Sequence, residues 1–90
     1  MKLEELYQII EDRKKNMPQD SYVASLFKSG KDGILQKVGE EATEVVIAAK
    51  NESKERMVSE VADLFFHLLV MLSAYKINLS EVLRELKKRS

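Results

Sequence analysis

The sequence predicts an all-α protein with four main helices in an antiparallel bundle. Apolar residues recur at three- and four-residue steps in four separate stretches, which is typical of amphipathic helices. No stretch has the strict alternation of a half-buried strand, and no internal repeat is present. The 90 residues are expected to form a single domain, residues 1–90, whose large exposed surface favours a partner subunit.

The first helix and the segment after it can be placed from local signals. The helix should end near residue 16, because Pro18 disfavours helical geometry at the residue before it. Residues 21–27 could form a short helix, and residues 28–33 are expected to be a polar loop with two glycines and two lysines. The first helix is predicted by one apolar stripe: Leu3, Leu6, Tyr7 and Ile10.

A long second helix should follow this loop. Asp32 is a plausible N-cap, because its carboxylate can accept from the amides of the first turn. The helix should end between residues 50 and 52, and Gly39 inside it leaves room for another helix or a ligand. Its predicted packing stripe is Leu35, Val38, Ala42, Val45 and Ala49.

The last two helices are predicted from caps and stripes as well. Ser53 can cap the third helix, and residues 78–81 have the arrangement of a capping box before the fourth. After Asp63 the third helix is apolar around most of its circumference, so the chain's own core should cover one side and a second subunit the other. The predicted core face of the third helix is Val58, Val61, Leu64, Phe65, Leu68 and Leu72, and the fourth helix repeats the stripe with Leu79, Val82, Leu83 and Leu86.

Composition narrows the class of protein. Fifteen basic and fifteen acidic residues balance, so nucleic acid and anionic membranes are not expected as main partners. The chain has no cysteine, which excludes disulfides and thiolate metal sites. The N-terminus lacks the order of a signal peptide, and the longest apolar run, residues 64–75, is shorter than the roughly 20 residues of a membrane helix. A soluble, cytoplasmic protein is expected.

Two acidic clusters are the candidate site. Residues three apart on a helix project from nearly the same side, so Glu41 pairs with Glu44, and Glu60 pairs with Asp63. Carboxylates crowded beside a core repel one another unless a cation neutralises them, and Mg²⁺ prefers oxygen ligands. Acids that merely solvate two helices are the alternative. Glu40 could be a further ligand, a base behind the ligands, or a partner of a nearby lysine.

His67 and the lysines near the acids have two interpretations each. His67 lies one turn after Asp63 and could be a ligand or proton shuttle, although a lone histidine in an apolar run is more often a core or interface group. Lys28 and Lys31 could close over an anion or belong to a solvated connector.

The two clusters also resemble a known family. Residues 40–44, Glu-Glu-Ala-Thr-Glu, and residues 60–63, Glu-Val-Ala-Asp, are similar to the EExxE…ExxD signature of the MazG-like all-α nucleotide pyrophosphohydrolases. More narrowly, Ser21-Tyr22 with Ser25-Leu26-Phe27, and the segment 36–46, resemble the phosphoribosyl-ATP pyrophosphatases of histidine biosynthesis. The similarity covers nearly the whole chain.

The resemblance implies a Mg²⁺-dependent, homodimeric enzyme that hydrolyses 1-(5-phosphoribosyl)-ATP to 1-(5-phosphoribosyl)-AMP and pyrophosphate, the second step of L-histidine biosynthesis. It also implies the roles of the acids. Glu41, Glu44, Glu60 and Asp63 would be the metal ligands, with Glu40 directly at the metal or just behind it.

A mechanism follows as a hypothesis from the residues and the resemblance together. Bound metal would offset charge on the phosphates, and Glu40 or Glu44 could orient or deprotonate the attacking water. Lys37, Lys28 and Lys31 could hold the triphosphate as point charges. The remaining candidates for substrate binding are Ser21 and Tyr22, which match family positions and would shape the pocket.

Two alternatives remain open at this stage. A MazG-like enzyme acting on ordinary or damaged nucleoside triphosphates would share the acids but not the segment 36–46. A non-catalytic helical dimerisation module would show no stabilisation by metal, whereas a metal bound only by the folded state raises the melting temperature.

Overall fold

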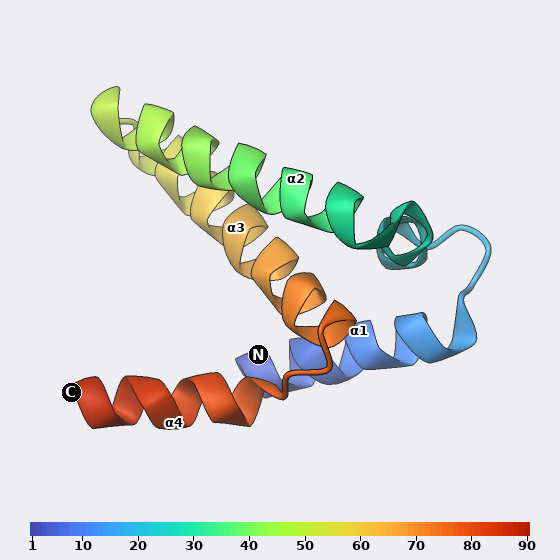
Figure 1. Cartoon of the computed structure of the whole chain (residues 1–90). Helices are drawn as coiled ribbons and strands as arrows, with labels where there is room; N and C mark the ends of the chain where they lie inside the picture. Colours follow the sequence, from blue (N-terminus) through green and yellow to red (C-terminus); the bar gives the residue numbers. More distant parts are fainter.

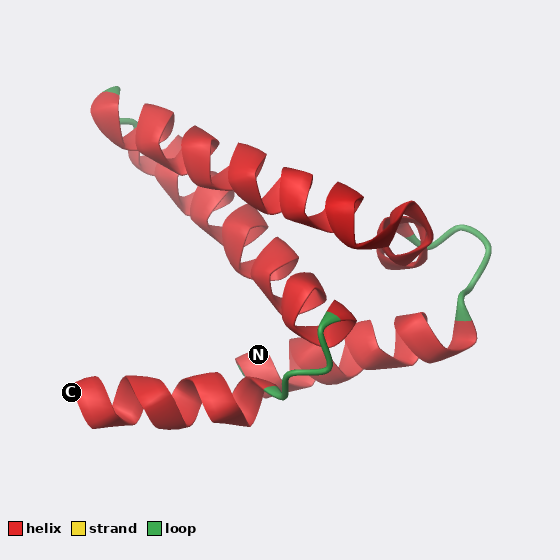
Figure 2. Cartoon of the chain, viewed as in Figure 1, coloured by secondary structure: helices red, strands yellow, loops and turns green.

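The structure, a computed structural model, describes all 90 residues as four helices joined by short loops, without a strand (Figure 2). The helices are α1 (Leu3–Asn16), α2 (Tyr22–Lys50), α3 (Lys54–Ala74) and α4 (Leu79–Arg89). Helices α2 and α3 form an antiparallel hairpin, α1 lies across the far end of α3, and α4 projects away from that end (Figure 1). The predicted all-α class with four helices is confirmed.

Local signals set the ends of the helices much as the sequence predicts. Helix α1 ends at Asn16, and the backbone of Met17 is left-handed with φ 48° before Pro18. The Ser21 hydroxyl accepts from the Ala24 amide at 3.1 Å at the start of α2. Ser53 caps α3 in the same way, and the capping box at the start of α4 is formed by Asn78 and Glu81.

The prediction of a polar loop over residues 28–33 is wrong. Helical structure continues on both sides of Gly30, whose φ of 81° and ψ of 177° turn the chain within one residue. Only glycine adopts such a backbone readily, so Gly30 alone makes the turn for which a six-residue loop was expected. Asp32 is consequently not an N-cap, because helical geometry resumes at Lys31 and Ile34 is already buried.

The buried face of α2 differs from the predicted stripe. Ile34 and Ala48 are almost fully buried, and Glu41 lies midway between them, seven residues from each. A seven-residue step returns to nearly the same side of a helix, so Glu41 lies on the face that packs against α3. The sequence analysis had placed this carboxylate at the edge of the packing face, with Leu35 and Ala49 inside, yet both of these are exposed.

The buried face of α3 also differs from the predicted one. Its buried residues are His67, Leu69, Val70 and Ser73. Two residues of the predicted core face are largely exposed in the single chain, Val58 at 64% and Phe65 at 48%. The side of α3 that carries the acids therefore faces α2, and much of its apolar side is left uncovered.

A second set of polar contacts fastens α1 to the end of α3. The Tyr7 hydroxyl donates to the Ile77 carbonyl at 2.7 Å, which joins residues near the two ends of the chain. Lys14 donates to the Ser73 carbonyl at 2.9 Å and forms an ion pair with Glu11 at 3.1 Å. The Ser73 hydroxyl in turn donates to Glu11, so both polar groups of this buried serine have partners.

The single chain is open rather than closed. Its radius of gyration is 13.9 Å, whereas a compact chain of this length has about 12 Å. Only 12 of the 90 residues are buried, which leaves a small core. An uncovered groove between α3 and α4 is lined entirely by apolar side chains: Leu3, Phe65, Leu68, Leu69, Leu72, Leu79, Val82, Leu83 and Leu86.

The length and apolar character of α3 also bear on whether this helix could span a membrane. With 21 residues, α3 is long and apolar enough to cross a membrane by length and composition alone. The core helix of a soluble protein meets the same criterion, and such a single helix is weak evidence for a membrane span.

Candidate metal centre and substrate site

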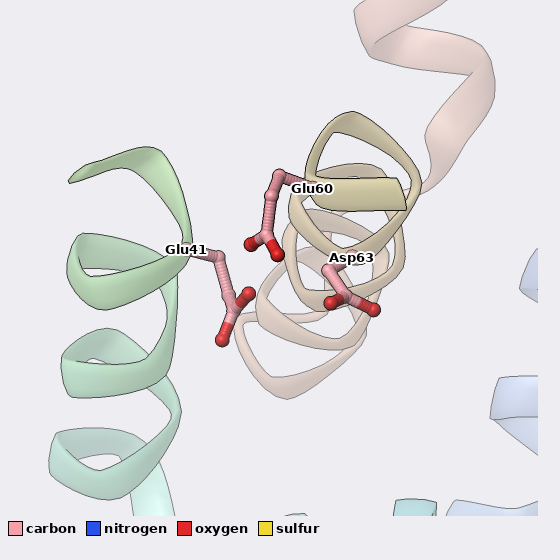
Figure 3. A group of neighbouring side chains, drawn as sticks. All are labelled: Glu41, Glu60 and Asp63. Atoms are coloured by element: carbon pink, nitrogen blue, oxygen red, sulfur yellow. The ribbon is translucent and has the colours of Figure 1, made fainter. Parts of the chain in front are cut away.

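Three of the four predicted metal ligands come together between α2 and α3. One carboxylate oxygen from each of Glu41, Glu60 and Asp63 can be chosen so that all three lie within 4.8 Å of one another. Glu41 reaches from α2 toward α3, and Glu60 points back from α3 toward Glu41 (Figure 3). The antiparallel hairpin thus brings together acids that are about twenty residues apart in the sequence.

Burial makes this arrangement demanding. The side chains of Glu41 and Glu60 are only 12% and 18% exposed, while Asp63 lies at the solvent edge. Negative charges this close repel one another, and their removal from water adds to the energetic cost. Three oxygen donors with one open side suit a hard divalent cation, which keeps its remaining positions for water or phosphate oxygens. The donor set therefore fits Mg²⁺.

The fourth predicted ligand, Glu44, is held by a cation from the opposite helix. Arg56 Nη2 lies 3.4 Å from Glu44 Oε2 and 3.9 Å from Glu60 Oε1, so one guanidinium bridges both acidic clusters. The sequence analysis missed Arg56. Its position one turn before Glu60 was the available signal, since residues four apart on a helix can form ion pairs.

Lys37 contacts the same group from α2. Its Nζ lies 3.3 Å from Glu41 and 3.9 Å from Glu40. The hydrogen bond to Glu41, with the nearby charges of Tyr22, Glu41 and Glu40, raises the pKa of Lys37 above its ordinary value despite partial burial. Lys37 is therefore a positive charge held beside Glu41.

Glu40 is not part of the three-carboxylate group. It is exposed and accepts a hydrogen bond from Gln36 Nε2 at 3.2 Å. An open depression on α2 is lined by Glu40 and Glu44 with Leu35, Gln36, Gly39 and Thr43. The EExxE segment thus presents Glu41 to α3 and Glu40 to this outer depression.

The predicted substrate residues are spread more widely. Ser21 uses its hydroxyl as the α2 cap, and the Tyr22 hydroxyl lies 2.8 Å from His67 Nε2. Lys28 is exposed and makes no hydrogen bond or ion pair within the chain. Lys31 lies with its Nζ 4.7 Å from the centre of the Tyr75 ring, roughly 15 Å before Glu41 along α2. Neither Lys28 nor Lys31 joins the carboxylate group.

An all-α hairpin with the acids of an EExxE segment set against those of an ExxD segment defines the MazG-like class of helical nucleotide pyrophosphohydrolases. Within this class, residues 3–90 match the family described as phosphoribosyl-ATP pyrophosphohydrolase. The chain belongs to the phosphoribosyl-ATP pyrophosphohydrolase family.

Similar proteins agree with this assignment. A phosphoribosyl-ATP pyrophosphatase of Metallosphaera sedula is 55% identical over 87 residues, covering 97% of this chain and 94% of that protein. The Geobacter sulfurreducens protein of the same name is 53% identical, with 97% and 81% covered. The histidine biosynthesis bifunctional protein HisIE of Caldanaerobacter subterraneus is 52% identical over 87 residues, which are 97% of this chain but 42% of that protein.

Proposed function

We propose that this chain hydrolyses the α–β phosphoanhydride of 1-(5-phosphoribosyl)-ATP and releases 1-(5-phosphoribosyl)-AMP and pyrophosphate, the second step of L-histidine biosynthesis. The observation that carries the proposal is the family match over residues 3–90, which includes every acid of the candidate site. We further propose that residues 1–90 act as a single, soluble domain in the cytoplasm.

The proposed cofactor is Mg²⁺ held by Glu41, Glu60 and Asp63. Support comes from the three converging oxygen donors, two of them largely withdrawn from solvent. When bound, the ion supplies positive charge opposite the phosphate oxygens as the anhydride breaks. Glu44, whose side chain is about half exposed, would be the fourth ligand once its carboxylate is released from Arg56.

The chain's own residues then have distinct tasks. Lys37 balances the charge of Glu41 and directs its remaining N–H donors toward phosphate oxygens of the substrate. Glu40 or Glu44 holds the attacking water and takes a proton from it as its oxygen bonds to phosphorus and pyrophosphate leaves. Both carboxylates line the depression on α2.

We propose that Ser21 and Tyr22 shape the nucleoside side of the site. The cap formed by Ser21 fixes the first turn of α2 and thereby the starting position of Tyr22. Tyr22 also contributes to raising the pKa of Lys37. Lys28 and Lys31 are further from the acids, so we propose that they contact outlying phosphates of this large substrate.

We propose that the enzyme is a homodimer, with a second copy covering the apolar side of α3 and α4. The groove lined by nine apolar residues adjoins a second apolar depression formed by Met57, Val58, Val61, Ala62 and Phe65. Contiguous apolar surface of this kind is rare on monomeric proteins. A C₂ partner presents the same surface and can bury both copies at once.

The decisive experiment measures pyrophosphate release from phosphoribosyl-ATP with and without Mg²⁺, beside a panel of ordinary ATP and dNTPs. Selective release that depends on Mg²⁺ is expected. Release from ordinary triphosphates alone would transfer the chain to another MazG-like activity, and no release from any substrate would favour a non-catalytic helical module.

Variants of the acids test the site itself. Glu44→Ala and Asp63→Ala should abolish turnover while circular dichroism shows unchanged helicity, because the loss is of ligands and not of packing. Glu55→Gln is the matched control, since Glu55 is an exposed acid on α3 outside the cluster. A variant that keeps full activity removes its residue from the site.

A further inference from the structure

His67 is a buried polar group whose two ring nitrogens both have partners. Only 4% of this residue is exposed. Nδ1 lies 2.7 Å from the backbone carbonyl oxygen of Asp63, and Nε2 lies 2.8 Å from the Tyr22 hydroxyl. One imidazole therefore connects the start of α2 to the backbone of a proposed metal ligand on α3.

The directions of these two hydrogen bonds follow from what each atom can do. A carbonyl oxygen only accepts, so Nδ1 must carry a hydrogen. In a neutral imidazole the other nitrogen is then an acceptor, and the Tyr22 hydroxyl must donate to Nε2. The phenol hydrogen is thus donated to His67, and toward other groups the phenol oxygen can only accept hydrogen bonds.

Tyr22 is held on several sides but remains open on one. Its ring stacks on Phe66 with centroids 6.1 Å apart and an interplanar angle of 26°. The His67 ring meets it edge-on at 5.8 Å, yet 51% of Tyr22 is exposed. Because His67 bonds both the Tyr22 hydroxyl and the backbone carbonyl of Asp63, the phenol lies one imidazole away from a proposed metal ligand.

We propose that His67 is a positioning residue of the substrate site, which takes the hydroxyl hydrogen of Tyr22 so that the phenol oxygen meets the substrate as an acceptor. The group it receives is a hydrogen-bond donor of the nucleoside, either a sugar hydroxyl or a nitrogen-bound hydrogen of the base. A phosphate oxygen is excluded as its partner, because two acceptors cannot share a bond. This assignment rests on the proposed function for the identity of the substrate.

The tautomer of His67 can be measured without any activity. His67 is the only histidine in the chain, so the imidazole signals of a uniformly ¹⁵N-labelled sample need no assignment. Long-range ¹H–¹⁵N correlation spectra should show the hydrogen on Nδ1 and an unprotonated Nε2, whose shift moves in Tyr22→Phe. A hydrogen on Nε2, or an Nε2 shift that ignores Tyr22→Phe, overturns the pair.

Steady-state kinetics test whether the pair acts on substrate. Tyr22→Phe should raise KM for phosphoribosyl-ATP about three- to tenfold, the range for one hydrogen bond, with a smaller change in kcat. His67→Leu should do the same, and the double variant should lose no more than either single variant. His67→Gln, which can still accept from the hydroxyl, should recover most of the loss. Multiplying losses in the double variant overturn the role of His67.

A matched control separates this effect from a general loss of packing. Ser73→Ala also removes a buried polar group from α3, but at the contact with α1 far from the acids. It should lower the melting temperature without changing KM. A KM increase in Ser73→Ala equal to that in His67→Leu would reduce His67 to a structural residue and overturn the proposal.

Two further measurements separate the proposed function from the Tyr22–His67 pair and test the donor that Tyr22 receives. If the unmodified protein releases no pyrophosphate from phosphoribosyl-ATP, the proposed function is wrong, and so is the proposed contact between Tyr22 and this substrate. The tautomer measurement would still test the hydrogen bond between Tyr22 and His67. The 2′-deoxyadenosine analogue tests one of the two proposed donors: a loss in the unmodified protein that is absent in Tyr22→Phe assigns the 2′-hydroxyl, and equal losses exclude that hydroxyl as the partner of Tyr22.

Discussion

Arg56 Nη2 lies 3.4 Å from Glu44 Oε2, so the carboxylate that the sequence motif contributes as a fourth ligand is paired with a cation from the neighbouring helix. The same guanidinium is 3.9 Å from Glu60. Arg56 therefore competes with any divalent cation for two of the acids, and its side chain is about half exposed.

Replacing Arg56 by glutamine should strengthen Mg²⁺ binding about two- to fivefold, because the exposed pairs that it removes are each worth up to about 1 kcal/mol. Isothermal titration calorimetry at fixed ionic strength measures the change. Lys54→Gln is the control, since Lys54 is an exposed cation of the same helix without an acidic partner. Weaker binding in Arg56→Gln would mean that the guanidinium orients Glu44 for the metal.

Gly30→Ala should lower the free energy of unfolding by about 1–3 kcal/mol, because a φ of 81° with a ψ of 177° lies in a backbone region that is open almost only to glycine. A Cβ there would meet nothing within 4 Å, so the loss is one of backbone conformation and not of space. Urea denaturation followed by circular dichroism provides the measurement.

Gly39→Ala is the matched change with the opposite sign. Gly39 is inside the regular part of α2, and a Cβ there also meets nothing within 4 Å. Alanine is the better helix former, so the free energy of unfolding should rise by about 0.5–1 kcal/mol. Gly39 also lines the depression with Glu40 and Glu44, and a gain in stability with a fall in activity would indicate close approach of substrate.

The contact between α1 and α3 should weaken at low pH. Burial acts to raise the pKa of Glu11, but hydrogen bonds from Ser73 and Lys14, and the charge of Lys14, outweigh it and hold the pKa below 4.5. A carboxylate whose pKa is lowered on folding stabilises the fold at pH values above its unfolded pKa. This stabilisation is lost as the pH falls through its folded pKa. The melting temperature should therefore drop below about pH 4.5, and less steeply in Glu11→Gln. Parallel pH profiles for the two proteins would contradict this.

Phe65 offers the sharpest test of the proposed dimer. It borders both apolar depressions on α3 and is 48% exposed in the single chain. Phe65→Glu should shift the protein from dimer to monomer in sedimentation velocity, because the interface would bury an unpaired charge. Glutamate at exposed Ser59 on the same helix should leave the assembly unchanged. A monomeric unmodified protein would remove the dimer from the proposal.

Features that depend on neighbours in sequence could be predicted. The caps at Ser53 and Asn78 each act within three residues, so local reading was sufficient. The spacing of the acids also predicted that Glu60 and Asp63 share a side of their helix, and the structure brings both to Glu41. The break at Gly30 could not be predicted, because a glycine in a polar segment is equally compatible with a loop or a one-residue kink.

The orientation of α3 could not be read from hydropathy, for a physical reason. Hydropathy predicts that the most apolar face of a helix is buried. On α3 it favours the face with Phe65 and Val58 over the face with Glu60 and His67. Within one chain the polar face nevertheless packs on α2, and the apolar face is left for a partner. Arg56 and the Tyr22–His67 pair were missed for a related reason, since both depend on which residues of two helices meet.

The inward position of Glu41 separates the demands of the fold from those of the chemistry. It occupies the point between Ile34 and Ala48 where a folding optimum would place leucine, and His67 occupies the equivalent kind of point on α3. Stability alone would erode the site, because well-packed apolar residues often replace buried charged groups without loss. In lineages that obtain histidine from their surroundings, positions 41 and 67 should be among the first to drift toward aliphatic residues while the helical hairpin persists.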